Sequence, residues 1–211
     1  MTLRRFVTFE GGEGSGKSTQ ARLLADRIAA AGYEAVATRE PGGAPFAEAI
    51  RTALLTPRPV APTHLAQALA FNAARADHLA ETIRPALARG AFVVCDRFTD
   101  STRVYQAHAG DLADETLQVL DDIVVGDTRA ELTFVLDIDP RVGLARAQSR
   151  RGAGDVDMYE ARALAFHDTL RAGFLAIAQA EPDRCRVVDG GLAPDALADV
   201  IWQHVSVHFA L

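Results

Sequence analysis

The sequence predicts an α/β protein, a three-layer sandwich in which helices flank a five-stranded parallel sheet. Short apolar runs without polar alternation, typical of strands buried on both faces, recur between longer segments with helical spacing. Strand–helix alternation with right-handed crossovers gives such a sandwich and places ligands beyond the carboxyl ends of the strands. With 211 residues, the chain is expected to form a single domain over residues 1–211.

The expected elements follow one another along the whole chain. Strands are expected at residues 5–10, 34–38, 91–96, 132–137 and 186–189, and helices at 17–31, 44–55, 63–89, 112–124, 140–149, 159–180 and 194–208. The longest helix has clear ends, because Pro62 and Thr63 suit a helix start and Gly90 suits a stop. Residues 150–157, RRGAGDVD, are expected to form a mobile loop because they combine glycine with arginine and aspartate.

Charge and cysteine usage exclude several classes of function. The chain has 28 acidic and 22 basic residues and a net charge of −6, which argues against binding nucleic acid or an anionic membrane through overall charge. No apolar run approaches the ~18 residues of a membrane span, and no signal peptide is expected. Cys95 and Cys185 belong to no CxxC motif and are expected to be free thiols in a reducing cytoplasm.

The most specific local motif is GGEGSGKS at residues 11–18, a complete GxxxxGK[ST] placed between an expected strand and an expected helix. Its glycines let backbone N–H groups surround phosphate oxygens, and the helix start adds a positive dipole. Lys17 is the only lysine of the chain. Its compact ammonium can reach between the β- and γ-phosphates, where a guanidinium is too wide. The residues expected to bind ATP are Gly11, Gly12, Glu13, Gly14, Ser15, Gly16, Lys17, Ser18 and Thr19.

The single lysine also narrows the class of nucleotide-binding protein. GTPases read guanine with an NKxD motif, which requires a second lysine, so a GTPase switch is not expected. An ATP-driven machine usually needs a longer chain. A kinase is therefore the leading class, and a regulatory nucleotide-binding module without transferase activity is the alternative.

Polar groups at the ends of two other strands suit a phosphate site. Asp96 and Arg97 end the third expected strand, where Asp96 together with Ser18 can hold Mg²⁺ and Arg97 can bridge donor and acceptor phosphates. Alternatively, Asp96 caps the next turn and pairs with Arg97. Arg39 lies at the end of the second expected strand and Arg51 on the next helix, where Arg51 offers a bidentate grip on a monophosphate or faces solvent.

Phe71 and Arg75 stand at i and i+4 on the longest expected helix and therefore share one face. A ring that stacks on a base beside a fixed donor forms a nucleobase pocket. An arginine donor suits the O4 carbonyl of thymine or uracil and opposes the amino group of cytosine. The alternative to a nucleobase pocket is that Phe71 belongs to the hydrophobic core and Arg75 lies on the surface.

Four segments, FEGGEGSGKST, TREPGG, FNAAR and DRFTDSTRVYQ, resemble bacterial thymidylate kinases (dTMP kinases) in their order and spacing, from about residue 5 to residue 190. The resemblance implies a P-loop nucleoside monophosphate kinase that transfers the γ-phosphate of ATP to dTMP, with Mg²⁺, in dTTP biosynthesis. It also implies a cytoplasmic homodimer. The runner-up is a P-loop kinase acting on another nucleoside or nucleoside monophosphate.

The resemblance assigns roles at matching positions. Phe71 stacks on thymine and Arg75 bonds its O4, while Glu13 approaches the 3′-hydroxyl of the sugar. The remaining residues expected to contact dTMP are Arg51 and Arg97 at the phosphate, Arg39 in support, Tyr105 where a 2′-hydroxyl would lie, and Thr102 and Gln106 in the base pocket.

Family members without a basic residue in the phosphate loop supply one from a lid. Position 14 is glycine here, and the lid expected at about residues 146–158 includes Arg146, Arg150 and Arg151. The expected catalytic residues are therefore Lys17, Arg97, Arg150 and Arg151. The chain departs from the family where Asp-Arg closes the lid, because it reads Asp157-Met158-Tyr159-Glu160.

Overall fold

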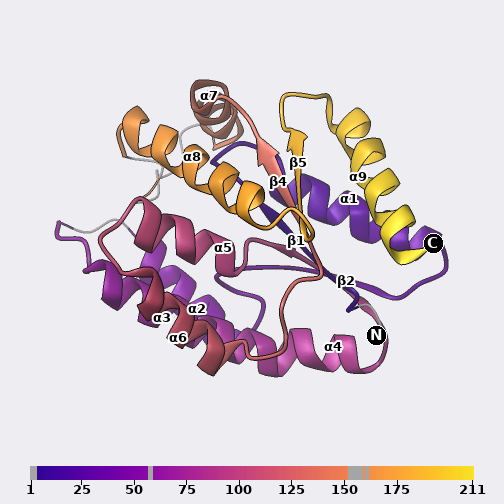
Figure 1. Ribbon diagram of the computed structural model, residues 1–211, viewed down its shortest axis with the longest axis horizontal. Helices are drawn as coiled ribbons and strands as arrows, with labels where there is room; N and C mark the ends of the chain where they lie inside the picture. The colour runs from indigo at the N-terminus through magenta and orange to yellow at the C-terminus, as the bar shows by residue number, and fades with distance from the viewer. Residues whose placement is uncertain (1–3, 57–58, 152–158, 160–161) are drawn as a thin grey trace.

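The computed structural model of the chain describes residues 4–56, 59–151, 159 and 162–211. In this part of the chain, five strands form one sheet in the order β2-β3-β1-β4-β5, and every neighbouring pair is parallel (Figure 1). The strands are β1 (Phe6–Glu10), β2 (Ala35–Arg39), β3 (Phe92–Asp96), β4 (Leu132–Asp137) and β5 (Cys185–Asp189). The predicted fold class is confirmed, and each strand end lies within one residue of its predicted position.

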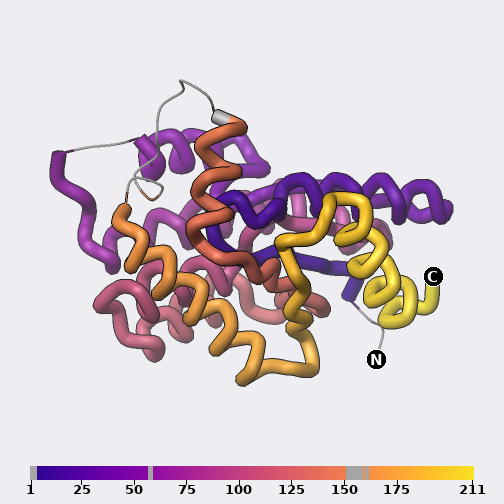
Figure 2. The backbone as a smooth tube through the Cα atoms, turned by 90° about the horizontal axis from the view of Figure 1, so that it is seen from above, coloured from indigo at the N-terminus to yellow at the C-terminus, as the bar shows by residue number. Residues whose placement is uncertain are grey.

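Two helices cover one face of the sheet. Helices α1 (Lys17–Ala30) and α9 (Pro194–Phe209) pack against each other and against this face, as Figure 2 shows. Val7 and Phe9 of β1 point into this layer, where they meet apolar side chains such as Leu24 and Ile201. Strand β1 is buried along its whole length because its alternate residues enter two different cores.

The opposite face is covered by a longer series of helices. The predicted helix 63–89 is a continuous run of α3 (His64–His78), a π-helical segment η1 (Leu79–Ile83) and α4 (Arg84–Ala88). Phe6 of β1 packs beneath this run, and α8 (Leu164–Ala180) covers the β4 and β5 side of the face.

The predicted helices 44–55, 112–124 and 140–149 correspond to α2 (Pro45–Leu55), α6 (Asp114–Val124) and α7 (Pro140–Arg151). Helix α8 begins five residues later than predicted.

One helical segment was absent from the prediction. After β3 the chain forms α5 (Thr99–Thr102) and continues directly into a second π-helical segment, η2 (Arg103–His108). Ser, Thr, Asp, Val and Tyr have modest helix propensity, so the sequence carries little local signal for this element. This difference from the prediction matters because three predicted site residues, Thr102, Tyr105 and Gln106, lie on the segment.

The register of the sheet brings three strand ends together. Asp96 of β3 lies opposite both Phe9 of β1 and Arg39 of β2. The ladders continue one step further, because Glu40 N donates to Asp96 O at 2.9 Å and Arg97 N donates to Phe9 O at 2.9 Å. The segments that follow β1, β2 and β3 therefore meet at one edge, where ligands of parallel α/β sheets bind.

None of the helices in the described part of the chain combines the length and the apolar character that a bilayer crossing requires.

Candidate active site

The phosphate loop joins β1 to α1 and packs directly against the start of α7. Gly14 has a positive φ of 66°, and a Cβ at this position would lie 1.9 Å from Gly143 O. The constraint is mutual, since a Cβ on Gly143 would lie 2.3 Å from Glu13 O. Two glycines thus let the backbone of α7 touch the backbone of the phosphate loop.

Lys17 lies at the first position of α1, is buried, and points back into the loop. Its Nζ donates to Gly11 O at 3.0 Å, Gly12 O at 2.7 Å and Ser15 Oγ at 3.3 Å. Burial lowers the pKa of Lys17 to about 8, and the positive charge of Arg97 adds to this effect. The loop therefore holds a desolvated ammonium that gains from meeting a polyanion.

Ser18 and Asp96 form the polar contact behind the loop. Ser18 Oγ donates to Asp96 Oδ2. The other carboxylate oxygen, Asp96 Oδ1, is buried and has no hydrogen-bond partner among the described residues. A hydroxyl beside a carboxylate with an unsatisfied oxygen matches the hard oxygen ligands that Mg²⁺ takes next to nucleotide phosphates.

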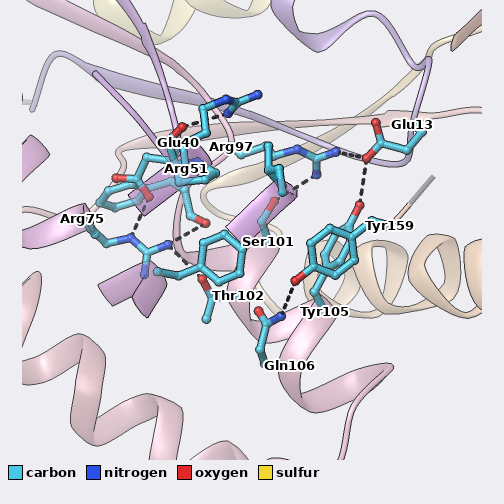
Figure 3. Close-up of a pocket in the computed structure, with 14 residues that line it drawn as sticks. Glu13, Glu40, Arg51, Arg75, Arg97, Ser101, Thr102, Tyr105, Gln106 and Tyr159 are labelled. Carbon is cyan, nitrogen blue, oxygen red and sulfur yellow. Dashed lines mark hydrogen bonds and ion pairs between the residues drawn. The ribbon is translucent and has the colours of Figure 1, made fainter. Parts of the chain in front are cut away.

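A cavity with about 610 Å³ of empty space, part of which is open solvent at its mouth, lies beside the phosphate loop (Figure 3). Of the residues predicted to bind dTMP, all except Arg39 line it: Glu13, Arg51, Phe71, Arg75, Arg97, Thr102, Tyr105 and Gln106. The cavity therefore collects residues from the phosphate loop, α2, α3 and the unpredicted α5–η2 segment.

Glu13, Arg97 and Tyr105 are joined at the end of the cavity nearest the phosphate loop (Figure 3). Glu13 Oε1 accepts from Arg97 Nη2 at 2.5 Å and from the Tyr105 hydroxyl at 3.1 Å. Burial opposes the charge of Glu13, but Arg97 and Lys17 outweigh it and hold its pKa at about 2. Glu13 is thus ionised at neutral pH and can accept a hydrogen bond from a hydroxyl group.

Arg97 adopts the left-handed backbone region with φ 69°, which is rare for a residue with a side chain. Its Nη1 donates to Ser101 Oγ at 3.2 Å and to Gly11 O of the phosphate loop at 3.4 Å. Its guanidinium carbon lies 5.4 Å from the ring centre of Tyr105. These contacts hold one arginine between the loop and the cavity.

The two other predicted phosphate arginines differ in placement. Arg51 lines the cavity, and its Nη1 donates to Pro41 O at 2.8 Å. Arg39 is exposed, its Nη2 lies 3.2 Å from both carboxylate oxygens of Glu48, and it is not part of the cavity wall. Its supporting role stays a prediction.

The base end of the cavity is formed by α3. Phe71 and Arg75 lie one helical turn apart and both line the cavity, as their spacing predicts. Arg75 is 2% exposed, so the alternative of a surface arginine is wrong. Burial opposes its charge, but the carboxylates of Glu40 and Asp121 outweigh this and raise the pKa of Arg75.

A sequence model of the thymidylate kinase family matches residues 9–201. The chain belongs to the thymidylate kinase family. A thymidylate kinase of Caulobacter vibrioides is 48% identical over 98% of this chain and all of its own length, and one of Rhodopseudomonas palustris is 50% identical over 95% and 88%. A crystal structure of thymidylate kinase from Ehrlichia chaffeensis has a TM-score of 0.73 at 29% identity, covering 95% of this chain and 97% of its own. The predicted family is confirmed.

Two residues of this thymidylate kinase family member, Glu10 and Tyr159, support the site directly but were not predicted from the sequence to do so. Glu10 is fully buried at the end of β1. Its Oε1 accepts hydrogen bonds from Phe98 N at 2.8 Å and from Ser101 N at 3.2 Å, and its Oε2 accepts one from Ser101 Oγ at 2.6 Å. Since Ser101 also bonds Arg97, Glu10 anchors the segment that carries Arg97. The one sequence feature that could have indicated this role of Glu10 is a charged residue at the end of a strand that is otherwise mostly apolar.

Tyr159 is the second such residue, and it lines the cavity beside Gln106 (Figure 3). The Tyr159 hydroxyl donates to Gln67 Oε1 at 2.8 Å, and Gln106 Nε2 donates to the same oxygen at 3.1 Å. The Tyr159 and Tyr105 rings meet edge to face at 5.0 Å. Gln67 lies one turn before Phe71 on α3, a spacing that could have indicated its place on the site face.

The predicted lid arginines of this thymidylate kinase family member are only partly described. Arg146 lies on α7, and its Nη1 and Nη2 donate to Gly190 O at 2.7 Å and Gly191 O at 3.1 Å. Arg150 is exposed near the end of the same helix, which extends two residues beyond its predicted end. The side chain of Arg151 and residues 152–158 lie outside the described part.

Proposed function

We propose that the chain transfers the γ-phosphoryl group of ATP to dTMP and releases ADP and dTDP. This is the activity of the thymidylate kinase family, and membership of that family confirms the predicted enzyme class. The roles given to single residues below are our own proposals. The observation that carries them is the position of Arg97, which bonds the phosphate loop at Gly11 and also lines the cavity with Glu13.

Phosphoryl transfer requires two nucleotides held in line and neutralisation of the charge on the transferred group. Lys17 exchanges its bonds to the loop carbonyls for bonds to the β- and γ-phosphates. Arg97 contacts the γ-phosphate from the cavity side, while Arg51 and Arg97 hold the dTMP phosphate that attacks it. A covalent intermediate is not needed, because the acceptor oxygen attacks the γ-phosphorus directly.

Mg²⁺ is the cofactor that suits the donors near the phosphates. Ser18 Oγ and the unsatisfied Asp96 Oδ1 would hold it, directly or through water. When bound, Mg²⁺ neutralises negative charge on the β- and γ-phosphates. The protein groups that remain, Lys17 and Arg97, orient the phosphates.

The far end of the cavity selects the nucleoside. Phe71 stacks on the base, Arg75 and Thr102 face its O4 edge, and Gln106 completes the wall. Glu13 accepts from the 3′-hydroxyl, and the Tyr105 ring takes the space of a 2′-hydroxyl. These contacts together favour a thymine deoxynucleotide.

We propose a single domain over residues 1–211, with a lid at about residues 146–158 that would supply Arg150 and Arg151 to the phosphates. The direct contact of α7 with the phosphate loop through Gly14 and Gly143 supports a role for this helix beside ATP. Closure would exclude water, which otherwise hydrolyses bound ATP.

A homodimer is proposed for the surface formed by α3 and α6, two helices that pack side by side. Leu65 and Leu69 on α3 and Val119 and Ile123 on α6 are large apolar side chains exposed to solvent by about half or more. Adjacent exposed apolar residues of this kind mark interaction surfaces. A cytoplasmic location is proposed because Cys95 and Cys185 are free and buried, as in proteins of reducing compartments.

A coupled assay of ADP release with MgATP and dTMP, dCMP or AMP tests the activity. The proposal expects dTMP to be preferred, and preference for dCMP or AMP contradicts it. Arg75→Ala should raise KM for dTMP and leave KM for ATP unchanged, while Arg129→Ala, which removes an exposed arginine, should change neither. Calorimetry that detects ATP binding but no dTMP binding would favour a regulatory nucleotide-binding module.

A further inference from the structure

A series of buried polar side chains runs behind the base end of the cavity, from β2 to α3. Thr38 Oγ1 lies 2.7 Å from His78 Nε2, and His78 Nδ1 lies 3.1 Å from Glu40 Oε1. The other oxygen of Glu40, Oε2, accepts from Arg75 Nε at 2.8 Å. His78 is completely buried, and Glu40 is 5% exposed. Glu40 also lines the cavity, whereas Thr38 and His78 lie behind its wall.

The chemistry of these groups fixes the direction of the hydrogen bond between His78 and Glu40. Glu40 forms a salt bridge with Arg75, so its carboxylate accepts. His78 Nδ1 must therefore carry a hydrogen and donate to Glu40, while Nε2 and the Thr38 hydroxyl share the second hydrogen bond of the ring. Every polar atom of the His78 ring is satisfied, which makes the ring a rigid support for the Glu40 carboxylate.

The TREPGG loop encloses this support. Gly43 has φ 82°, and a Cβ there would lie 2.4 Å from His78 Nε2 and 2.5 Å from Thr38 Oγ1. The loop can pass over the ring because this residue has no side chain. His78 is thus confined by the loop on one side and by its own hydrogen bonds on the other.

The guanidinium of Arg75 is oriented by these contacts. Its Nε is held by Glu40, and its Nη1 donates to Asn72 Oδ1 at 3.3 Å. The remaining nitrogen, Nη2, donates to Thr102 Oγ1 at 2.9 Å and to Phe98 O at 3.2 Å, and both residues line the cavity. Because the group is planar, fixing two nitrogens also fixes the third at the cavity wall.

We infer that Glu40 and His78 are positioning residues for base selection: His78, held by Thr38, fixes the Glu40 carboxylate, and Glu40 fixes Arg75 so that its guanidinium and the Thr102 hydroxyl that it bonds face a carbonyl at position 4 of the base. The inference rests on the proposed base-reading role of Arg75. A guanidinium free to turn can move its N–H groups away from an amino group at position 4. Loss of Glu40 or His78 therefore weakens the rejection of cytosine more than it weakens catalysis.

The test measures kcat/KM for dTMP, dUMP and dCMP, together with KM for ATP, in Glu40→Gln, His78→Phe and Thr38→Val. Loss of a hydrogen bond to a charged group changes an equilibrium by about tenfold. The ratio of dTMP to dCMP should therefore fall by about tenfold in Glu40→Gln and His78→Phe, and by less in Thr38→Val. The ratio of dTMP to dUMP and the KM for ATP should stay unchanged, because both pyrimidines present O4 and ATP lies elsewhere.

A conservative variant separates positioning from packing. The amide of His78→Asn can still donate to Glu40, so this variant should retain most of the discrimination that His78→Phe loses. Thr133→Val is the matched control, because it removes the hydrogen bonds that Thr133 Oγ1 makes with Thr8 Oγ1 at 2.7 Å and with Arg184 Nη1 at 2.8 Å, outside the cavity wall. It should lower the melting temperature without changing the ratio of dTMP to dCMP.

Two outcomes overturn the inference: an unchanged ratio of dTMP to dCMP in folded Glu40→Gln and Thr38→Val, or an equal fall in Thr133→Val. If His78→Phe does not fold, the other two variants still decide. A wild-type enzyme without any preference for dTMP over dCMP would instead contradict the proposed role of Arg75 itself. If the wild type prefers dTMP over dCMP and the variants show the same preference, the base-reading role of Arg75 stands and only the positioning role of Glu40 and His78 is contradicted.

Discussion

Glu10→Gln should stabilise the protein above neutral pH although it removes a charged group from beside the active site. Burial raises the pKa of Glu10 from 4.5 to about 7, and the nearby Asp100 adds to the rise, against hydrogen bonds from Ser101 and the charge of Arg97. The folded chain thus binds a proton more tightly than the unfolded chain. The stability contributed by this group is fully present below pH 4.5 and is lost as pH rises through 7.

The size of the effect follows from the gap between the two pKa values. A gap from 4.5 to about 7 corresponds to roughly 3 kcal/mol of unfolding free energy at pH 8, and to about 1 kcal/mol at pH 5. Glutamine keeps the geometry, since its Oε1 can accept from Phe98 N and Ser101 N and its Nε2 can donate to Ser101 Oγ. The variant therefore avoids the cost of a buried charge and keeps a contact at each of these positions, although the hydrogen bond with Ser101 Oγ reverses its direction.

Urea unfolding followed by circular dichroism at pH 5, 6, 7 and 8 measures this difference. The advantage of Glu10→Gln over wild type should grow with pH up to about 7 and then level off. Glu115→Gln, which neutralises an exposed carboxylate on α6, should show no such growth. A variant that is less stable than wild type at pH 8, or a difference independent of pH, would refute the reasoning.

Three further results are expected. Lys17→Ala should keep its circular dichroism spectrum and lose kcat by several orders of magnitude in the ADP-release assay; near-normal turnover would contradict the role of the ammonium. Gly143→Ala should raise the KM for ATP by about tenfold and should also raise the KM for dTMP, because the new methyl group displaces the backbone of Glu13, which belongs to both sites; KM values equal to those of the wild type would show that α7 moves aside without cost. Ile123→Glu should convert dimer to monomer in size-exclusion chromatography with light scattering, and an unchanged mass would place the interface elsewhere.

The sheet and the phosphate loop could be predicted from sequence because their signals are local. Strand β4 is a continuous apolar run ended by Asp137, and its predicted bounds are those observed. The α5–η2 segment gives no such signal. It is held by a distant residue, since the Glu10 carboxylate accepts from the backbone N–H of Ser101 within the segment and from that of Phe98 just before it. Local sequence patterns carry no information on a contact between the end of β1 and the segment after β3, because the two are far apart in the sequence.

The same distinction applies within the candidate site. The spacing of Phe71 and Arg75 correctly predicted a shared face, but not the buried carboxylate of Glu40, which depends on the pairing of β2 with β3. Arg39 lies outside the cavity wall, and the phosphate contact that its position at a strand end suggested stays a prediction. Side chains alternate along a strand, so while Thr38 points inward to His78, Arg39 points out to Glu48.

The backbone contact between Gly14 and Gly143 limits the paths by which this enzyme can evolve. A side chain at position 14 would collide with Gly143 O, so an arginine cannot be gained at this position of the phosphate loop by one substitution. A change that moves α7 aside must come first, and the order of the two mutations then decides whether the intermediate functions. Substitutions at positions 14 and 143 are thus expected to occur together among relatives.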